Sequence, residues 1–273
     1  MGRPARVLAL RTNVRTLRAM RRLLAICLVA LALPALIGAA SNPVVDAVKR
    51  TATAKTMTMQ LAVTATIGGQ RSTLTGSGVQ KGTSARVSLS TRTQGVVVHV
   101  DAIILREHRS YVMYVRSPAL LAQLPRGKSW IRIDLSKQAS SGLGVDFSSL
   151  MSSSQTFAPL EKGLVSTTRE GREVVAGRST TRYRAVLDIQ RAARAVPAYG
   201  AQIAALERAT GLHLGRQTYH LWIGGDGRLR RLRFSLPTAA AGFRGTMVQT
   251  MTFRAFDTPV TITAPPRSQV VTV

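Results

Sequence analysis

The sequence predicts an α+β protein in which one large antiparallel sheet curls and a few short helices cover one of its faces. Three observations lead to this prediction. About eleven short segments alternate between apolar and polar residues, which is the period of a strand. Turn residues separate nearly all of these segments, as in a meander of antiparallel strands. So many strands exceed the usual size of a flat sheet, and we therefore expect curvature.

The first forty residues have the pattern of an export signal. Seven arginines precede an uncharged run, LLAICLVALALPALIGAA, which extends from Leu23 to Ala40 and ends in small residues. We expect residues 1–40 to be a signal peptide that is cleaved after Ala40. Since 18 uncharged residues also reach the length of a short membrane span, an uncleaved N-terminal anchor is the alternative. Both interpretations place the rest of the chain outside the cytoplasm. The basic region is unusually long, which favours translation starting at Met20 rather than Met1.

The single cysteine, Cys27, lies inside this apolar run. The exported chain therefore has no thiol, disulfide or cysteine metal site. We expect no lipidation at Cys27, because Ile26 stands where the signal of a lipoprotein has a small residue.

The exported chain, residues 41–273, is expected to be a single domain. It begins with a helix from Pro43 to about Thr53, for which Asn42 is the expected N-cap. A short helix is expected at 118–124 and a longer one within 192–212, ended by Gly211. The serine-rich stretch 136–162 holds scattered apolar residues and is too long for a turn, so we interpret it as a lid. The expected strands are residues 56–67, 71–80, 84–92, 96–105, 109–116, 129–135, 171–178, 180–190, 217–224, 228–236 and 246–257.

The stretch YHLWIGGDGRLRRLRF, residues 219–234, is predicted to be two strands joined by a tight turn. Its glycines invite comparison with a phosphate-binding loop, but such a loop opens onto a helix and this one opens onto another strand. Arg231 and Arg233 are expected to point outward. The opposite, apolar face of this hairpin is expected to consist of Tyr219, Leu221, Ile223, Leu232, Phe234 and Leu236.

The chain is strongly basic, with 38 Lys+Arg against 12 Asp+Glu and a formal charge of +26. Removing the seven N-terminal arginines leaves 31 basic side chains and a charge of +19. Such an excess indicates an anionic partner, which is a membrane surface or an acidic envelope polymer. Nucleic acid is not expected, because the chain is exported, its arginines are spread over nearly every strand, and aromatic residues make up only 5% of it.

No pattern in the chain indicates catalysis or a metal site. The four histidines, His99, His108, His213 and His220, lie in strand patterns, in a turn and just past a helix, without a second metal-ligating residue at the required spacing. Gly76-Ser77-Gly78 lacks the spacing of a nucleophile elbow. Acidic residues stand singly, so we expect neither an enzyme nor a cofactor.

The order of the segments resembles the periplasmic lipoprotein-carrier (LolA-like) fold, and within it the actinobacterial LppX/LprAFG-type envelope lipoproteins. The segments are VVDAVKRTATAKTMTMQLAV, SYVMYVRSPALLAQLPRGKSWIRIDL, EVVAGRSTTRYRAVLDI, YHLWIGGDGRLRRLRF and MTFRAFDTPVTITAPP, spread over about residues 43–266. The resemblance implies a curved antiparallel half-barrel of about eleven strands whose concave face is closed by helices around an apolar cavity for lipid chains. Members are commonly anchored through a cysteine at the cleavage site, whereas Ser41 follows Ala40 here.

The resemblance implies a non-catalytic carrier that binds a lipid or acylated glycolipid and moves or presents it in the cell envelope, as a monomer. The residues alone also allow a fully packed core, since methionines fill gaps as well as they adapt to ligands. In that alternative the protein is an envelope interaction or sensor module that binds an acidic polymer or a partner protein through its basic surface. The expected cavity residues are Met59, Leu61, Val63, Tyr183, Leu187, Tyr219, Leu221, Ile223, Leu232, Phe234, Met251 and Phe253, and those of the lid are Leu143, Val145, Phe147, Leu150, Met151 and Phe157.

Overall fold

The computed structural model describes residues 42–93, 95–108, 110–135, 159–240 and 243–272. In these residues, the helices are α2 (Pro43–Ala52), α3 (Pro118–Leu121), α7 (Ile189–Ala195) and α8 (Pro197–Thr210), residues 159–163 are also helical, and a 3-10 turn η1 spans Arg267–Gln269. The strands are β1 (Thr56–Ile67), β2 (Gln70–Lys81), β3 (Ser84–Thr93), β4 (Val96–Glu107), β5 (Ser110–Arg116), β6 (Trp130–Asp134), β7 (Leu164–Val175), β8 (Arg178–Asp188), β9 (Arg216–Gly224), β10 (Leu229–Ala240), β11 (Phe243–Phe256) and β12 (Val270–Thr272).

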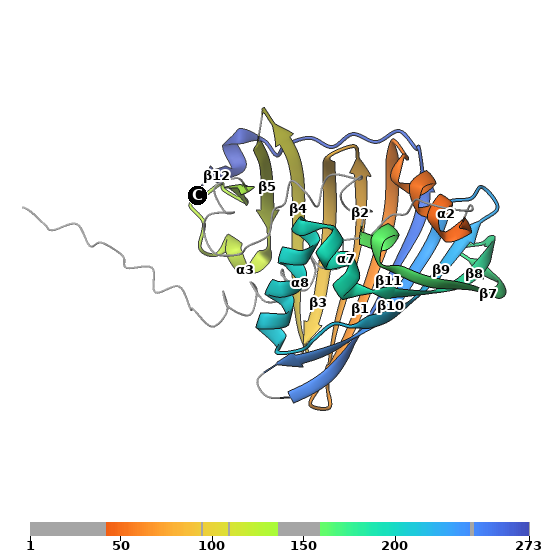
Figure 1. Cartoon of the computed structure of the whole chain (residues 1–273). Coiled ribbons are helices and arrows are strands. Elements are labelled where there is room, and N and C mark those ends of the chain that lie inside the picture. The colour runs from red at the N-terminus through yellow and green to blue at the C-terminus, as the bar shows by residue number, and fades with distance from the viewer. Residues whose placement is uncertain (1–41, 94, 109, 136–158, 241–242, 273) are drawn as a thin grey trace, which may run out of the picture. The chain divides into compact units, whose positions relative to one another are not determined.

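All of these strands belong to one open sheet, and the predicted α+β half-barrel is confirmed. The order is β12-β6-β5-β4-β3-β2-β1-β11-β10-β9-β8-β7. Two meanders, β1–β6 and β7–β11, are thus joined by the pairing of β1 with β11. Helices α7 and α8 lie across one side of the sheet (Figure 1), where α7 contacts β8 and β9 and α8 contacts β10.

Three expectations need correction. A twelfth strand, β12, pairs in parallel with β6. Its three residues are too few to show a period, so the pattern gave no sign of it. The strand expected at 171–178 begins at Leu164, because STTREGRE carries polar residues on both faces of a mostly exposed strand. The single long helix is two helices, since Val196 before Pro197 is extended (φ −130°, ψ 95°), as residues preceding proline prefer.

The predicted helix and turn signals at Asn42, Gly211 and the glycine-rich turn are confirmed. Asn42 caps α2, with its side-chain oxygen accepting a hydrogen bond from Val44 N at 3.1 Å. Gly211 ends α8 in the left-handed conformation (φ 67°), which favours glycine. The glycine-rich stretch after β9 is a hairpin turn, where Gly227 (φ 72°) donates to Gly224 O at 2.9 Å.

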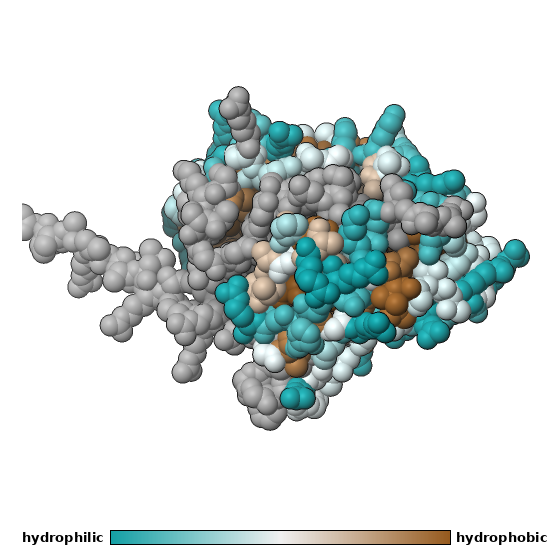
Figure 2. Space-filling view, viewed as in Figure 1, coloured by the Kyte–Doolittle hydropathy of each residue, from teal (hydrophilic) through white to brown (hydrophobic). Residues whose placement is uncertain are grey.

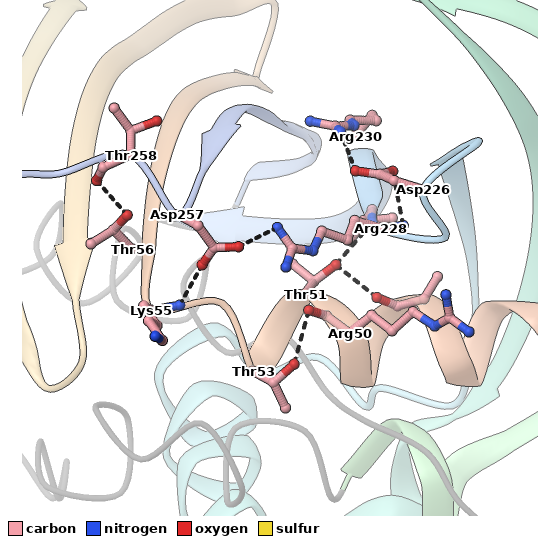
Figure 3. Close-up of polar contacts among 12 residues, drawn as sticks. Arg50, Thr51, Thr53, Lys55, Thr56, Asp226, Arg228, Arg230, Asp257 and Thr258 are labelled. Atoms are coloured by element: carbon pink, nitrogen blue, oxygen red, sulfur yellow. Dashed lines mark hydrogen bonds and ion pairs between the residues drawn. The ribbon is translucent and has the colours of Figure 1, made fainter.

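A polar network fastens α2 to the β9–β10 turn and to the end of β11 (Figure 3). Thr51 Oγ1 accepts a hydrogen bond from Leu229 N at 2.8 Å and donates one to Ala47 O at 2.7 Å. Beyond it, Arg228 pairs with Asp257 at 2.6 Å. The helix therefore covers the ends of β9 and β10 in one defined position, which its contacts with both strands reflect.

Candidate functional site

The register of the sheet divides its side chains between an inner face, which the helices cover, and an outer face. On the inner face one row crosses five strands, from Ala185 through Tyr219, Phe234 and Gln249 to Val63. Every residue of this row is at least nine-tenths buried. The apolar alternation of the sequence therefore forms a continuous inner face, as expected for the hairpin at 219–234.

The part of the inner face formed by β8–β11 is closed by α2, α7 and α8. Leu187, Leu221, Leu232, Met251 and Phe253 are at most 2% exposed. Since helices contact β8, β9 and β10 directly, this covered half of the inner face is packed like an ordinary core.

The part formed by β1–β6 is different, because most of its apolar side chains remain partly exposed, although Leu74, Ile104 and Val115 are buried. Leu61 on β1 is in register with Gly76 on β2, which is in register with Leu89 on β3 and then Val100 on β4. Gly76 has room for no side chain of its own, since an added Cβ would lie 2.5 Å from Leu89 Cδ2. The half-buried apolar residues of this open half are Met59, Leu61, Val87, Leu89, Val98, Val100, Met113, Ile131 and Ile133.

The expected cavity residues divide unequally between these halves. Met59 and Leu61 lie in the open half, and Val63 is buried at its border with β11. Tyr183 is half-buried on β8, and the other eight are buried in the covered half. The lid residues Leu143, Val145, Phe147, Leu150, Met151 and Phe157 lie outside the described residues. Figure 2 shows brown apolar residues that reach the surface beside the polar helices on this side.

The selection of candidates missed most of the open half, although a signal was present. Val87, Leu89, Val100 and Met113 stand at alternate positions of strands that were themselves correctly expected. The expected cavity residues lie mainly in the C-terminal strands, in which aromatic residues are concentrated. The local pattern does not tell which strands the helices cover.

A second apolar cluster lies on the outer face of β4–β6. Ile103, Val112, Tyr114 and Trp130 are at most 8% exposed, and Ile262 and Val270 of the C-terminal segment pack against them together with Leu105. This cluster explains why VVVHVDAII carries apolar residues at successive positions toward its end. Ile103 and Ile104 point to opposite faces, and both are buried.

Glu107 joins three strands on this outer face. Its carboxylate accepts hydrogen bonds from Tyr114 Oη at 2.6 Å and from Arg132 Nη2 at 2.9 Å. The bond from Tyr114, supported by Arg132, holds the pKa of Glu107 below its ordinary value although burial acts in the opposite direction. The group is a structural ion pair, since neither partner faces the inner side.

The outer face of β7–β10 carries a cationic and aromatic cluster. The guanidinium groups of Arg182 and Arg231 lie 5.2 and 5.3 Å from the ring centroid of Trp222, which donates a hydrogen bond to Glu173 at 2.7 Å. His220 Nδ1 lies 3.1 Å from Glu170. Arg233 is exposed, whereas Arg231 is partly covered by its contact with Trp222. Glu170 and Glu173 therefore hold some of the polar and aromatic side chains of this basic outer surface in place.

The described ranges contain no group of three or more His, Cys, Asp and Glu side chains placed to hold a metal ion. Within the same residues no helix is long and apolar enough to cross a membrane.

Comparisons with known proteins found similar folds and no similar sequence. Neither a protein-family model nor a curated protein matches the chain. Among solved structures, lipoprotein LppX from Mycobacterium tuberculosis is 12% identical, with a TM-score of 0.47 over 81% of this chain and 96% of its own. LprF from Mycobacterium bovis is 15% identical, with a TM-score of 0.46 over 81% of this chain and 93% of its own. A DUF1329 family protein from Desulfovibrio piger is 12% identical, with a TM-score of 0.30 over 78% of this chain and 90% of its own.

Proposed function

We propose that this protein is a non-catalytic carrier, exported to the cell envelope, which binds a lipid or an acylated glycolipid against the inner face of its sheet. The observation that supports this proposal is the open half of the inner face, where most apolar side chains of strands β1–β6 are only half-buried. A contiguous apolar surface of this kind is rare in soluble proteins unless it binds something.

Acyl chains fit this surface because binding to it needs little polar recognition. Each CH₂ group removed from water contributes about 0.8 kcal/mol, so ten methylene groups contribute about 8 kcal/mol before the cost of association. Methionines at positions 59 and 113 add flexible, polarizable contacts that accommodate chains of different shape. The ligand then lies on β1–β5, beside the helices that close the other half.

The test begins with the protein isolated from its natural host. Native mass spectrometry is expected to detect a bound, extractable lipid, and the delipidated protein is expected to take up a fluorescent fatty acid. A protein that carries no lipid and takes up no probe would contradict the proposal.

Substitutions on the two faces locate the binding surface. Leu61→Asn together with Leu89→Asn is expected to weaken probe binding at least about tenfold, since two leucine contacts of about 1 kcal/mol or more each are lost. Val79→Asn is the matched control, because Val79 is half-buried on β2 but belongs to the outer face, in register with Thr58. Equal loss of binding in both variants, at equal thermal stability, would place the ligand elsewhere.

A second role at an anionic membrane surface is compatible with the first. Val96 and Val97 are 65% and 39% exposed where β4 begins. Two arginines lie near these valines. Arg92 on β3 is in register with Val97. On β2, Thr73 is in register with Arg92, and Arg71 lies two residues before Thr73. Exposed valines among arginines suit an interface that carries negative charge.

Vesicle sedimentation tests this role. We expect binding to vesicles that contain phosphatidylglycerol, weaker binding to pure phosphatidylcholine, and release by salt. Val96→Asp is expected to reduce binding, whereas Val174→Asp is not, since Val174 is equally exposed (67%) at the far end of β7. Binding to an acidic polysaccharide but not to these vesicles would favour the envelope-polymer alternative.

A further inference from the structure

A histidine on the outer face of β9 lies between two groups that compete for the same ring nitrogen. His220 Nδ1 lies 3.2 Å from Arg182 Nη2, which only donates hydrogen bonds, and 3.1 Å from the carboxylate oxygen Glu170 Oε2, which only accepts them. The nitrogen accepts a hydrogen bond when it carries no hydrogen and donates one when it does. Nδ1 therefore bonds with Arg182 or with Glu170, but not with both at once.

The charge of His220 decides between these two partners. Only a neutral ring with its hydrogen on Nε2 accepts the hydrogen bond from Arg182. In the protonated ring both nitrogens carry hydrogens, so the bond with Arg182 cannot form and the one donated to Glu170 is charge-assisted. Histidine side chains change charge between about pH 5 and 8, and the side chain of His220 is 27% exposed, so solvent protons reach it. Acidification therefore takes an acceptor away from Arg182 and adds a positive charge to this face.

Arg182 connects this exchange of partners to a tryptophan. Its guanidinium group lies 5.2 Å from the ring centroid of Trp222, which stands two residues after His220 on β9. Trp222 is 3% exposed, and its indole nitrogen donates a hydrogen bond to Glu173 at 2.7 Å. A change in the position of Arg182 therefore alters the surroundings of this buried ring, and tryptophan fluorescence reports that change.

His220 also belongs to a row of cationic side chains across three strands. It is in register with Arg184 on β8 and with Arg233 on β10, and neighbouring strands lie about 4.8 Å apart. Both arginines are exposed. Like charges directly opposite one another on a sheet are unfavourable, so protonation of His220 adds repulsion that an anion bound across the row would offset. The other charged groups beside the row are Glu170 and Glu173 on β7, Arg182 on β8 and Arg231 on β10.

The composition of this face favours a soluble polyanion over a membrane or a protein partner. The exposed large apolar side chains of the described residues lie on α3, β4 and β7, and none lies on β8, β9 or β10. The face therefore has no apolar group to insert into a bilayer or to form the core of a protein interface. Arginine side chains pair well with carboxylates, which an acidic polysaccharide repeats along its chain.

We propose that the outer face of β8–β10 binds an acidic polysaccharide through Arg184, His220 and Arg233, and that protonation of His220 strengthens this binding. The inference goes beyond the proposed function, because the lipid lies on the inner face and the membrane contact is at the start of β4. Linkage requires the reverse effect as well, so that binding of the polysaccharide favours proton uptake by His220.

The experiment measures binding of an oligogalacturonate of defined length at pH 7.5 and pH 5.5, at constant ionic strength. The carboxylates of this probe remain ionised at both pH values. The wild type is expected to bind about twofold to fivefold more tightly at pH 5.5, since one exposed charge contact is added. His220→Gln is expected to keep the affinity of pH 7.5 and to lose the difference. His213→Gln is the matched control and should keep the difference, because the side chain of His213 is 76% exposed and lies outside this face.

A double variant tests the row of arginines. Arg184→Gln with Arg233→Gln is expected to weaken binding about threefold to twentyfold at both pH values, since two exposed contacts are lost. Arg71→Gln with Arg92→Gln is the matched control, because it removes two exposed arginines from β2 and β3 and should leave binding nearly unchanged. Equal losses in the two double variants would show that only the overall charge matters, and would overturn the assignment of the face.

Fluorescence tests the exchange of partners directly. In a Trp130→Phe background, the emission of Trp222 is expected to change between pH 7.5 and pH 5.5, and His220→Gln should abolish the change. Constant emission in this background, or a pH difference in oligogalacturonate binding that persists in His220→Gln, would overturn the role of His220. A wild type that binds no oligogalacturonate at either pH would overturn the whole inference, whereas the carrier function depends on the separate uptake of the fatty acid probe.

Discussion

Replacing Thr51 by valine tests how α2 is held over the covered half of the inner face. Thr51 is 1% exposed, and its hydroxyl lies 2.8 Å from Leu229 N and 2.7 Å from Ala47 O. Valine keeps the shape of threonine but offers no acceptor, so the N–H of the fully buried Leu229 loses its partner. A buried donor without a partner costs about 1–3 kcal/mol. In a domain of this size that corresponds to a decrease in Tm of roughly 4–8 °C at about 2 kcal/mol.

Urea denaturation followed by circular dichroism measures this loss directly. Thr51→Ser is the matched control, because serine keeps the hydroxyl and loses only a methyl group, and it should retain most of the stability. Thr53→Val is a second control, since the exposed Thr53 hydroxyl bonds only to Arg50 O in the same helix end. Wild-type stability in the valine variant, or an equal loss in the serine variant, would show that the hydrogen bond to Leu229 is not what fastens the helix.

Two further predictions concern pH and backbone packing. The folded pKa of Glu107 lies below its ordinary value of 4.5, so its stabilisation is complete above that pH and is lost as the pH falls through the folded pKa. Glu107→Gln should therefore lower the unfolding free energy at pH 7, and the difference from wild type should shrink below about pH 4.5; a constant difference would argue against the linkage. Gly245→Ala should cost about 1–3 kcal/mol in urea denaturation, because its Cβ would lie 2.0 Å from Thr66 O, whereas Gly215→Ala meets nothing within 4 Å and should be nearly neutral. Equal stabilities of the two alanine variants would refute the close approach of β1 and β11 at Gly245.

Local patterns were sufficient to predict most strands, the cap at Asn42 and the hairpin after β9, because each depends on neighbouring residues. The local patterns failed to predict burial where the register of the strand pairing shifts. The irregularity between Leu229 and Arg231 removes Arg230 from the alternation of β10, and Arg230 is 5% exposed against Asp226 and over the ring of Phe256. A run of arginines in a sequence gives no sign that one of them is buried.

The division of the inner face was beyond sequence reasoning for a similar reason. Leu61 and Leu232 occupy equivalent positions in alternating strands, yet the first is half-buried and the second is 2% exposed. The difference arises from helices that follow β8 and return over β8–β10, which is a long-range packing choice. The candidates drawn from aromatic-rich strands therefore fall mostly in the packed half.

This division would let one sheet combine stability with the binding surface proposed above. The covered half supplies a close-packed core, whose buried residues need no ligand to be stable. The open half leaves apolar area in contact with solvent, which disfavours the unliganded protein by about 25 cal/mol for each Å² that a ligand would cover. In the proposed function, a bound acyl chain would recover that free energy without disturbing the packed half.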